Sequence, residues 1–254
     1  MPYGNLNIIA VTGSGGGSGV TTVAAQLAAA LTLHQQPCIA IDASPRNALR
    51  LHFGMTWEDE AGLSTQVLSG LPWNEAAFRS PSGTDFIPIG NAAQDFDAWL
   101  TSHPGWFGKR MAEIDQQEGF VICDCPDRRG ALGSQILSAS RLALVVLSPD
   151  ALSYATAERT RQEALSAGAA GAFFVVNKFD PTRMLDRDLE ALIHADFKED
   201  CLPMLIHRDE SVREALANKK TVLDYAPSCQ AASDFSALAT WLIAHCARER
   251  EEAA

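Results

Sequence analysis

Five glycines lie between residues 13 and 19, with only serine between them, and threonines follow at positions 21 and 22. Backbone N–H groups of such a loop converge on a phosphate, because glycine leaves room for close approach and accepts positive φ angles. A hydroxyl at the end of a phosphate-binding loop is a suitable Mg²⁺ ligand. The segment therefore indicates a site for a phosphorylated ligand.

Three polar side chains stand at the ends of short apolar runs, namely Asp42, Asp124 and Asn177. A carboxylate after a buried strand can hold Mg²⁺ directly or through water. An amide both donates and accepts hydrogen bonds, which matches the N6/N7 edge of adenine. Together with the glycine segment, these residues are candidate ligand-binding groups.

The positions of these residues depend on buried strands that alternate with helices. Apolar, β-branched runs predict strands at 6–11, 38–42, 85–89, 120–124, 142–147, 172–177 and 202–206. Helical patterns occupy 23–31, 47–53, 63–68, 99–117 with a break near 104–105, 151–166, 184–196, 211–218 and 231–248. This alternation predicts an α/β fold, a mostly parallel sheet flanked by helices on both faces, in which ligands bind at the carboxyl ends of the strands. Pro88 suggests an edge strand, and the polar residues after 248 are expected to fray.

Composition narrows the class of protein further. With 254 residues and 47% hydrophobic content, the chain is expected to form a single domain over 1–254. A net charge of −11 disfavours a nucleic-acid partner, which would require phosphate neutralisation by Lys and Arg. The sequence has no apolar run near the ~18 residues of a membrane span and no recognisable signal peptide, so we expect no direct membrane insertion. The six scattered cysteines are expected to be free thiols in a reducing cytoplasm.

The glycine segment also matches the turn of NAD(P)-dependent short-chain dehydrogenases, and Asp42 then stands where a ribose-binding acid ends the second strand. Such an oxidoreductase requires a tyrosine whose pKa is lowered by a lysine four residues later. Tyr154 is followed at that spacing by Glu158, whose carboxylate would raise the pKa instead. This alternative is therefore the more remote one.

A second alignment covers more of the chain. Residues 15–22, Gly-Gly-Gly-Ser-Gly-Val-Thr-Thr, resemble the deviant Walker A loop of the MinD/ParA P-loop ATPases, which is Lys-Gly-Gly-Val-Gly-Lys-Thr-Thr. Pro126 after Asp124 resembles the family's Asp-x-Pro turn, and residues 202–209 resemble its last strand and base-flanking loop. The resemblance implies that ATP and Mg²⁺ are the cofactors and that Thr21, Asp42 and Asp124 face the metal. It also implies a set of nucleotide-binding residues, which are Gly15, Gly16, Gly17, Ser18, Gly19, Val20, Thr21, Thr22, Asn177 and Asp209.

Within that family, residues 42–51, 70–90 and 202–210 are most similar to the BcsQ branch, the MinD-like proteins of bacterial cellulose secretion. The resemblance implies a cytoplasmic regulatory subunit that forms an ATP-dependent homodimer. It also implies docking on subunits of an inner-membrane cellulose synthase complex. Since no basic helix ends the sequence, recruitment to the membrane is expected to come from protein contacts.

Three residues depart from the pattern of active family members. Gly15 and Val20 stand where the family has lysines, and Ser44 stands where it has the hydrolytic aspartate. Losing groups that stabilise phosphoryl transfer predicts nucleotide binding with weak or no hydrolysis. An active ATPase that uses unconventional residues is the alternative, with Arg46 and Arg128 as candidate cations. Solvated loop arginines are the simpler interpretation of both.

Overall fold

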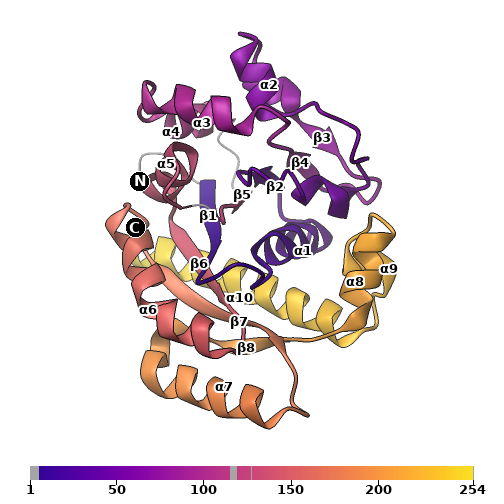
Figure 1. The fold of residues 1–254 in the computed structure, drawn as a ribbon, viewed down its shortest axis with the longest axis vertical. Helices are drawn as coiled ribbons and strands as arrows, with labels where there is room; N and C mark the ends of the chain where they lie inside the picture. The colour runs from indigo at the N-terminus through magenta and orange to yellow at the C-terminus, as the bar shows by residue number, and fades with distance from the viewer. Residues whose placement is uncertain (1–5, 115–118, 127, 254) are drawn as a thin grey trace.

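The computed structural model describes residues 6–114, 119–126 and 128–253. Its centre is an eight-stranded sheet in the order β3-β4-β2-β5-β1-β6-β7-β8, in which only β3 runs antiparallel to its neighbour (Figure 1). The strands are β1 (Leu6–Gly13), β2 (Cys38–Asp42), β3 (Phe78–Arg79), β4 (Asp85–Ile87), β5 (Gly119–Asp124), β6 (Leu142–Leu147), β7 (Ala172–Phe179) and β8 (Cys201–His207).

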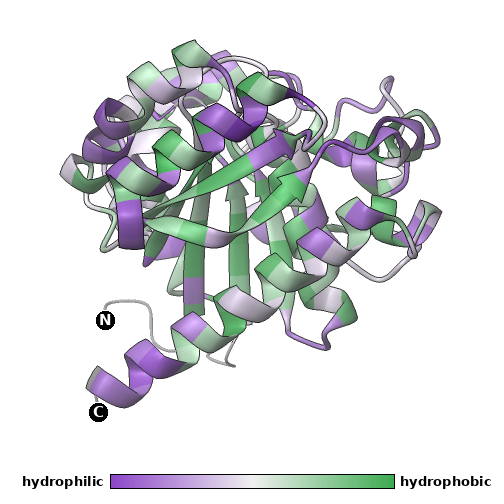
Figure 2. Cartoon of the chain, turned by 90° about the horizontal axis from the view of Figure 1, so that it is seen from below, coloured by the Kyte–Doolittle hydropathy of each residue, from purple (hydrophilic) through white to green (hydrophobic). Residues whose placement is uncertain are grey.

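Helices cover both faces of the sheet, and their apolar residues face inward (Figure 2). One face carries α1 (Val20–Leu33), the 3₁₀ turn η1 (Leu49–Phe53), α8 (Glu210–Ala217), α9 (Val222–Tyr225) and α10 (Gln230–Ala253). The other carries α2 (Leu63–Leu68), η2 (Trp73–Ala76), α3 (Ala93–Thr101), α4 (Trp106–Met111), α5 (Ala131–Ala139), α6 (Ala151–Ser166) and α7 (Met184–Phe197), which is followed by η3 (Lys198–Asp200). No helix of the described ranges is long and apolar enough to cross a membrane.

Strand β1 shows why both faces are covered. Successive side chains of a strand point to opposite faces, so Ile8 and Ala10 enter one core cluster and Ile9 and Val11 enter the other. All four are almost completely buried. A strand with two apolar faces is stable only between two layers of helices, and β1 therefore lies inside the sheet, where it carries the glycine loop (residues 13–19) at its carboxyl end.

The predicted α/β fold is confirmed, and several elements have the predicted bounds, among them β2, β6, α2 and α6. The predicted helix at 47–53 is a shorter 3₁₀ turn, and the break near 104–105 separates α3 from α4. The end of that predicted helix, 115–117, lies outside the described residues. Helix α5, helix α9 and strand β3 are present without having been predicted.

Two predictions were wrong, one about the edge of the sheet and one about the end of the chain. Strand β4 is not an edge strand, because β3 pairs with its outer side; Pro88 follows the paired residues, where its missing N–H breaks no ladder bond. The residues after 248 do not fray, since α10 continues to Ala253. Glu249 is held by Arg141 at 2.8 Å and by His245 at 3.2 Å, which anchors the polar end of α10.

Candidate nucleotide-binding site

The glycine loop (residues 13–19) joins β1 to α1 at the carboxyl end of the sheet. Gly17 and Gly19 have φ angles of 85° and 97°, a region that favours glycine. Gly13 is required for a different reason, since a Cβ there would lie 2.6 Å from the Ser18 hydroxyl. The loop thus folds back over its own first residue and delivers the N-terminus of a fourteen-residue helix to the site.

Neighbouring elements hold the loop from two sides. On the α6 side, the Ser14 and Ser153 hydroxyls are 2.6 Å apart, and the Thr156 hydroxyl donates to the Ser14 carbonyl at 2.9 Å. On the β7 side, the Asn177 amide nitrogen donates to the Ser18 carbonyl at 2.8 Å, and the Lys178 amino group donates to the Gly17 carbonyl. The loop conformation is therefore set by tertiary contacts as well as by glycine.

Two adjoining cavities lie at this edge of the sheet. The first, the phosphate cavity, has a volume of about 610 Å³ and is lined by the whole glycine loop, Val20 to Thr22, the segment after Asp42, Pro126 and Arg128. The second, the base cavity, measures about 400 Å³ and is lined by Asn177, Asp209 and α8. Thr22 and Leu216 line both cavities. The pair thus offers a polar compartment with backbone donors next to a second compartment bounded by an amide.

The predicted metal-facing carboxylates lie side by side and are completely buried. Asp42 accepts hydrogen bonds from the backbone N–H groups of Ser44 at 2.8 Å and Leu49 at 3.1 Å. Burial nevertheless raises the pKa of Asp42 to about 7, although these two bonds and Arg50 oppose the shift. The start of η1 holds the ionised carboxylate of Asp42 in place. Asp42 therefore has a structural role in addition to any contact with a metal.

Asp124 has a different environment. Neither of its carboxylate oxygens has a hydrogen-bond partner among the described residues. Burial, and next the charge of Asp42, raise the pKa of Asp124 well above its usual range, while the nearby Thr21 hydroxyl lowers it. A buried carboxylate without donors is unfavourable unless a cation or proton joins it. The donor set of Asp124, Asp42 and the Thr21 hydroxyl therefore suits Mg²⁺, which prefers oxygen ligands and retains some of its waters.

The described residues contain no cluster of three or more His, Cys, Asp or Glu side chains able to hold a metal alone. Two carboxylates and one hydroxyl form an incomplete shell, which fits an ion that also binds phosphate oxygens. The geometry is consistent with a metal that arrives with a nucleotide.

The two predicted base-contacting residues, Asn177 and Asp209, differ in the hydrogen bonds that they already make. Asn177 is buried at the edge of the base cavity, but one of its N–H groups is already bonded to the Ser18 carbonyl. Asp209 begins α8 and accepts from the backbone N–H groups of Ser211 at 2.9 Å and Ala231 at 3.2 Å. Burial would raise the pKa of Asp209, but these hydrogen bonds lower it below its usual value. Asp209 lines the base cavity and at the same time joins α8 to α10.

Ser44, which stands at the position of the family's hydrolytic aspartate, and the candidate cations Arg46 and Arg128 differ in burial and in hydrogen bonding. Ser44 is buried, and its hydroxyl accepts from the Arg46 backbone N–H at 3.3 Å. Arg46 is exposed at the rim of the phosphate cavity, as a solvated loop arginine would be. Arg128 is not solvated: it donates to the Gly13 carbonyl at 3.2 Å and to Glu163 at 2.6 Å. The sequence indicated no partner for Arg128, because Glu163 lies 35 residues away on α6.

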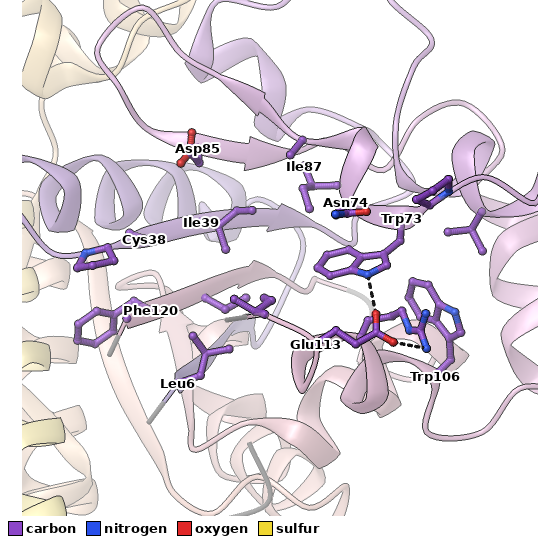
Figure 3. A pocket seen from close by; sticks show the side chains of 18 of the residues that line it. Leu6, Cys38, Ile39, Trp73, Asn74, Asp85, Ile87, Trp106, Glu113 and Phe120 are labelled. Atoms are coloured by element: carbon purple, nitrogen blue, oxygen red, sulfur yellow. Dashed lines mark hydrogen bonds and ion pairs between the residues drawn. The ribbon is translucent and has the colours of Figure 1, made fainter. Parts of the chain in front are cut away.

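A cavity of equal volume lies at the opposite, amino-terminal edge of the sheet (Figure 3). Its walls are apolar and aromatic, and the Trp73 indole donates to Glu113 at 3.1 Å across it. The cavity contains neither the glycine loop nor the buried aspartates. We place the candidate site at the carboxyl edge, because chemistry-bearing groups from five separate segments converge there.

The features expected of a short-chain dehydrogenase do not assemble. Tyr154 is half-buried on α6, where it packs beside Phe197, and it donates its hydroxyl hydrogen to Asp196. This hydrogen bond, followed by burial and the charge of Asp196, raises the pKa of Tyr154. A catalytic tyrosine of that class needs the opposite shift.

All six cysteines are free, as predicted.

Comparison with known proteins finds one family whose members match nearly the whole chain. A model of the family described as cellulose biosynthesis protein BcsQ matches residues 6–243. The cellulose biosynthesis protein BcsQ of Salmonella typhi is 29% identical over 254 residues, covering 98% of each chain. The protein of the same name from Escherichia coli K12 is 29% identical over 243 residues, covering 94% of each chain.

Solved structures share the fold at lower identity. The septum site-determining protein MinD of Pyrococcus horikoshii, complexed with Mg-ADP, superposes with a TM-score of 0.79 at 20% identity, covering 93% of this chain and 96% of that one. Cobyrinic acid a,c-diamide synthase of Mycobacterium smegmatis, with bound ADP and magnesium, has a TM-score of 0.77 at 20% identity, covering 94% and 95%. The fold is thus that of MinD/ParA-like P-loop proteins. Since the family model spans all but the last residues of the described chain, this chain belongs to the family of the cellulose biosynthesis protein BcsQ.

Proposed function

We propose that this protein is an ATP- and Mg²⁺-binding regulatory or scaffold subunit of a cellulose synthase secretion complex, with weak or no hydrolysis. The observation that carries the proposal is the composition of the phosphate cavity. The glycine loop lines this cavity, and the buried Asp42–Asp124 pair lies at the same carboxyl edge of the sheet. The cavity has Ser44, Val20 and Gly15 where active relatives of the MinD/ParA type have charged groups.

Binding requires only groups that the cavity still contains. The backbone N–H groups in the first turn of α1 have no acceptor within the helix, and together with those of the glycine loop they favour an anion at the helix N-terminus. Thr21, Asp124 and Asp42 would hold Mg²⁺ directly or through water, and the ion would neutralise part of the phosphate charge. Asn177 keeps an amide N–H and its carbonyl oxygen available toward a base.

Turnover requires groups that the cavity lacks. A serine cannot carry a charge or accept a proton from water at neutral pH, so Ser44 cannot replace the hydrolytic aspartate. Val20 and Gly15 provide no cation for the developing charge on the phosphates. One observation favours the alternative of a working ATPase: the Arg128 guanidinium lies in the wall of the phosphate cavity. Movement of Arg128 from Glu163 toward a phosphate would supply one of the missing charges.

The family also supports a proposal for assembly. We propose a two-fold, ATP-dependent homodimer in which the glycine loops face one another, and docking on synthase subunits through protein contacts. The protein would then be cytoplasmic and recruited to the inner membrane. Gly15, Gly16 and Gly17 have no heavy atom within 4 Å of an added Cβ, so another backbone can approach closely here. Trp57, with 58% of its surface exposed, is a large apolar side chain available to a partner.

The first experiment asks what the purified protein binds and whether it turns the ligand over. Calorimetry should detect ATP–Mg²⁺ binding, and phosphate release should stay at background. No adenine-nucleotide affinity up to millimolar concentration would refute the proposal. Steady phosphate release that Asp124→Ala abolishes would favour the working ATPase, and Arg128→Met would then test the source of the charge.

The second experiment concerns assembly. Light scattering should show a doubled mass with ATP–Mg²⁺, and moderate salt should assist by screening the net charge of −11. A mass that stays monomeric at every salt concentration would contradict self-association. Binding of the isolated protein to anionic vesicles would contradict recruitment through protein contacts.

A further inference from the structure

Asn177 and Lys178, at the end of β7, form a clasp on the back of the glycine loop. The Asn177 amide donates to the Ser18 carbonyl at 2.8 Å, and the Lys178 amino group donates to the preceding carbonyl, that of Gly17. We propose that Lys178 is a positioning residue for phosphate binding, which orients the loop donors and supplies a cation that the loop itself lacks. This inference deepens the proposed function and rests on it.

The orientation of the donors follows from peptide geometry. In a trans peptide, the C=O of one residue and the N–H of the next point in opposite directions. The carbonyls of Gly17 and Ser18 point toward β7, where the clasp binds them. The N–H groups of Ser18 and Gly19 must therefore point away from β7, toward the phosphate cavity. The clasp fixes two of the donors that a phosphate would use.

The backbone of Lys178 is shaped for this contact. Its φ angle is 63°, a left-handed conformation that a lysine adopts only when its surroundings compensate. The register between β7 and β8 is irregular at this point, since Asn177 pairs with Ile206 and Phe179 pairs with the next residue, His207. Lys178 is thus the extra residue of a bulge, which lets two successive side chains, Asn177 and Lys178, reach the same loop.

The loop and the clasp are in direct contact. A Cβ added to Gly19 would lie 2.3 Å from the Asn177 amide nitrogen and 3.7 Å from the Lys178 Cε. No water layer fits between Asn177 and Gly19, so this amide packs directly on the loop, while the exposed Lys178 side chain reaches the Gly17 carbonyl with its amino group. Because Gly15 and Val20 carry no charge, this ammonium is a fixed positive charge bonded to the middle of the loop.

The test uses a ligand series in which the number of phosphates changes. Adenosine, AMP, ADP and ATP with Mg²⁺ are titrated by calorimetry into the wild type, Lys178→Met, Lys178→Arg and Lys198→Met. Lys198 is a matched control, because it is also an exposed lysine with positive φ, 47°, and its removal changes the net charge equally. Thermal unfolding of each variant checks that the fold is retained, which the exposure of Lys178 favours.

We expect Lys178→Met to weaken ATP binding by about tenfold to a hundredfold, the size of a lost charged hydrogen bond, while adenosine binding changes little. Lys178→Arg should recover part of the affinity, and Lys198→Met should match the wild type. ATP affinity of Lys178→Met within twofold of wild type, or an equal loss for adenosine and ATP, would overturn the inference alone. A wild type that binds none of the nucleotides would overturn the proposed function as well.

Discussion

Asp42 and Asp124 occupy directly paired positions on the neighbouring strands β2 and β5, and both are completely buried. Their surroundings differ: Asp42 accepts two backbone hydrogen bonds, whereas Asp124 accepts none from the described residues. The pair therefore consists of one carboxylate fixed by the protein and one left for a cation. Without that cation, both pKa values are raised, chiefly by burial.

The first prediction concerns stability and pH. A carboxyl whose pKa is raised in the folded state keeps its proton there while the unfolded chain releases it. The free energy of unfolding should therefore fall as pH rises from about 4, the ordinary aspartate pKa, through the value of about 7 for folded Asp42. Asp124→Asn removes one charge of the pair, so at pH 8 without Mg²⁺ we expect the variant to be more stable by about 1–3 kcal/mol.

Urea unfolding at pH 4 and pH 8 measures this difference. The gain should vanish at pH 4, where both aspartates of the wild type are protonated when folded. The same variant should lose the stabilisation that ATP–Mg²⁺ gives the wild type. An Asp124→Asn variant that is less stable than wild type at pH 8 would show that the pair is not under electrostatic stress.

A second prediction isolates the metal. Thr21→Val keeps the shape of the side chain but removes the hydroxyl that faces Asp124. We expect ATP affinity in the presence of Mg²⁺ to fall about tenfold, the effect of losing one good polar contact. Affinity in EDTA should be unchanged, because the backbone donors remain. Equal losses with and without Mg²⁺ would show that Thr21 supports the loop rather than the ion.

The third prediction separates backbone strain from ligand contact. Gly19→Ala forces a side chain onto a residue with φ of 97° and into contact with Asn177, so stability should fall by at least about 1–2 kcal/mol and ATP binding should be lost. Gly70→Ala is the control: its φ is 73°, and nothing lies within 4 Å of an added Cβ. It should show the backbone cost but bind ATP normally, as measured by thermal unfolding and calorimetry.

The same loop gives a complementary variant. Gly16 has no positive φ and no heavy atom near an added Cβ, yet it lines the phosphate cavity. Gly16→Ala should therefore leave stability within about 0.5 kcal/mol of wild type and still weaken ATP binding, because its methyl group enters the space for phosphate. Unchanged ATP affinity would place the phosphates elsewhere in the cavity.

A fourth prediction addresses the missing lysine. Val20 begins α1 in the wall of the phosphate cavity, with 7% of its surface exposed. Val20→Lys should tighten ATP–Mg²⁺ binding by about tenfold to a hundredfold through one charge-assisted hydrogen bond. Phosphate release should stay at background, since Ser44 is unchanged, and should rise only when Ser44→Asp is added. Hydrolysis by the Val20→Lys variant alone would disprove the assigned importance of position 44.

Local sequence determined much of the architecture. The apolar runs of β2, β5 and β6 could be predicted as strands from their own residues, because they are short, apolar and rich in β-branched side chains. The glycine loop and its threonines indicated a phosphate site, since few other functions require glycine at that density before a helix. Helix α5 was missed because its sequence, Ala-Leu-Gly-Ser-Gln-Ile-Leu-Ser-Ala, has an interior glycine and two serines, which have low helix propensity. Its stability comes from the packing of Leu132, Ile136 and Leu137 against the sheet.

Only the tertiary structure decided which side chains meet. Spacing along the chain placed Asp42 and Asp124 at strand ends, but the register of β2 and β5 makes them partners. Arg128 was expected to be solvated, and the packing of α6 instead gives it Glu163, whose pKa the arginines around it, with Arg129 foremost, lower to about 2. Lys178 reaches Gly17 only because β7 bulges beside β8. Sequence specifies residue types and local conformation, whereas contacts between residues that are distant in the sequence depend on strand order and register, which arise from burial of the whole core.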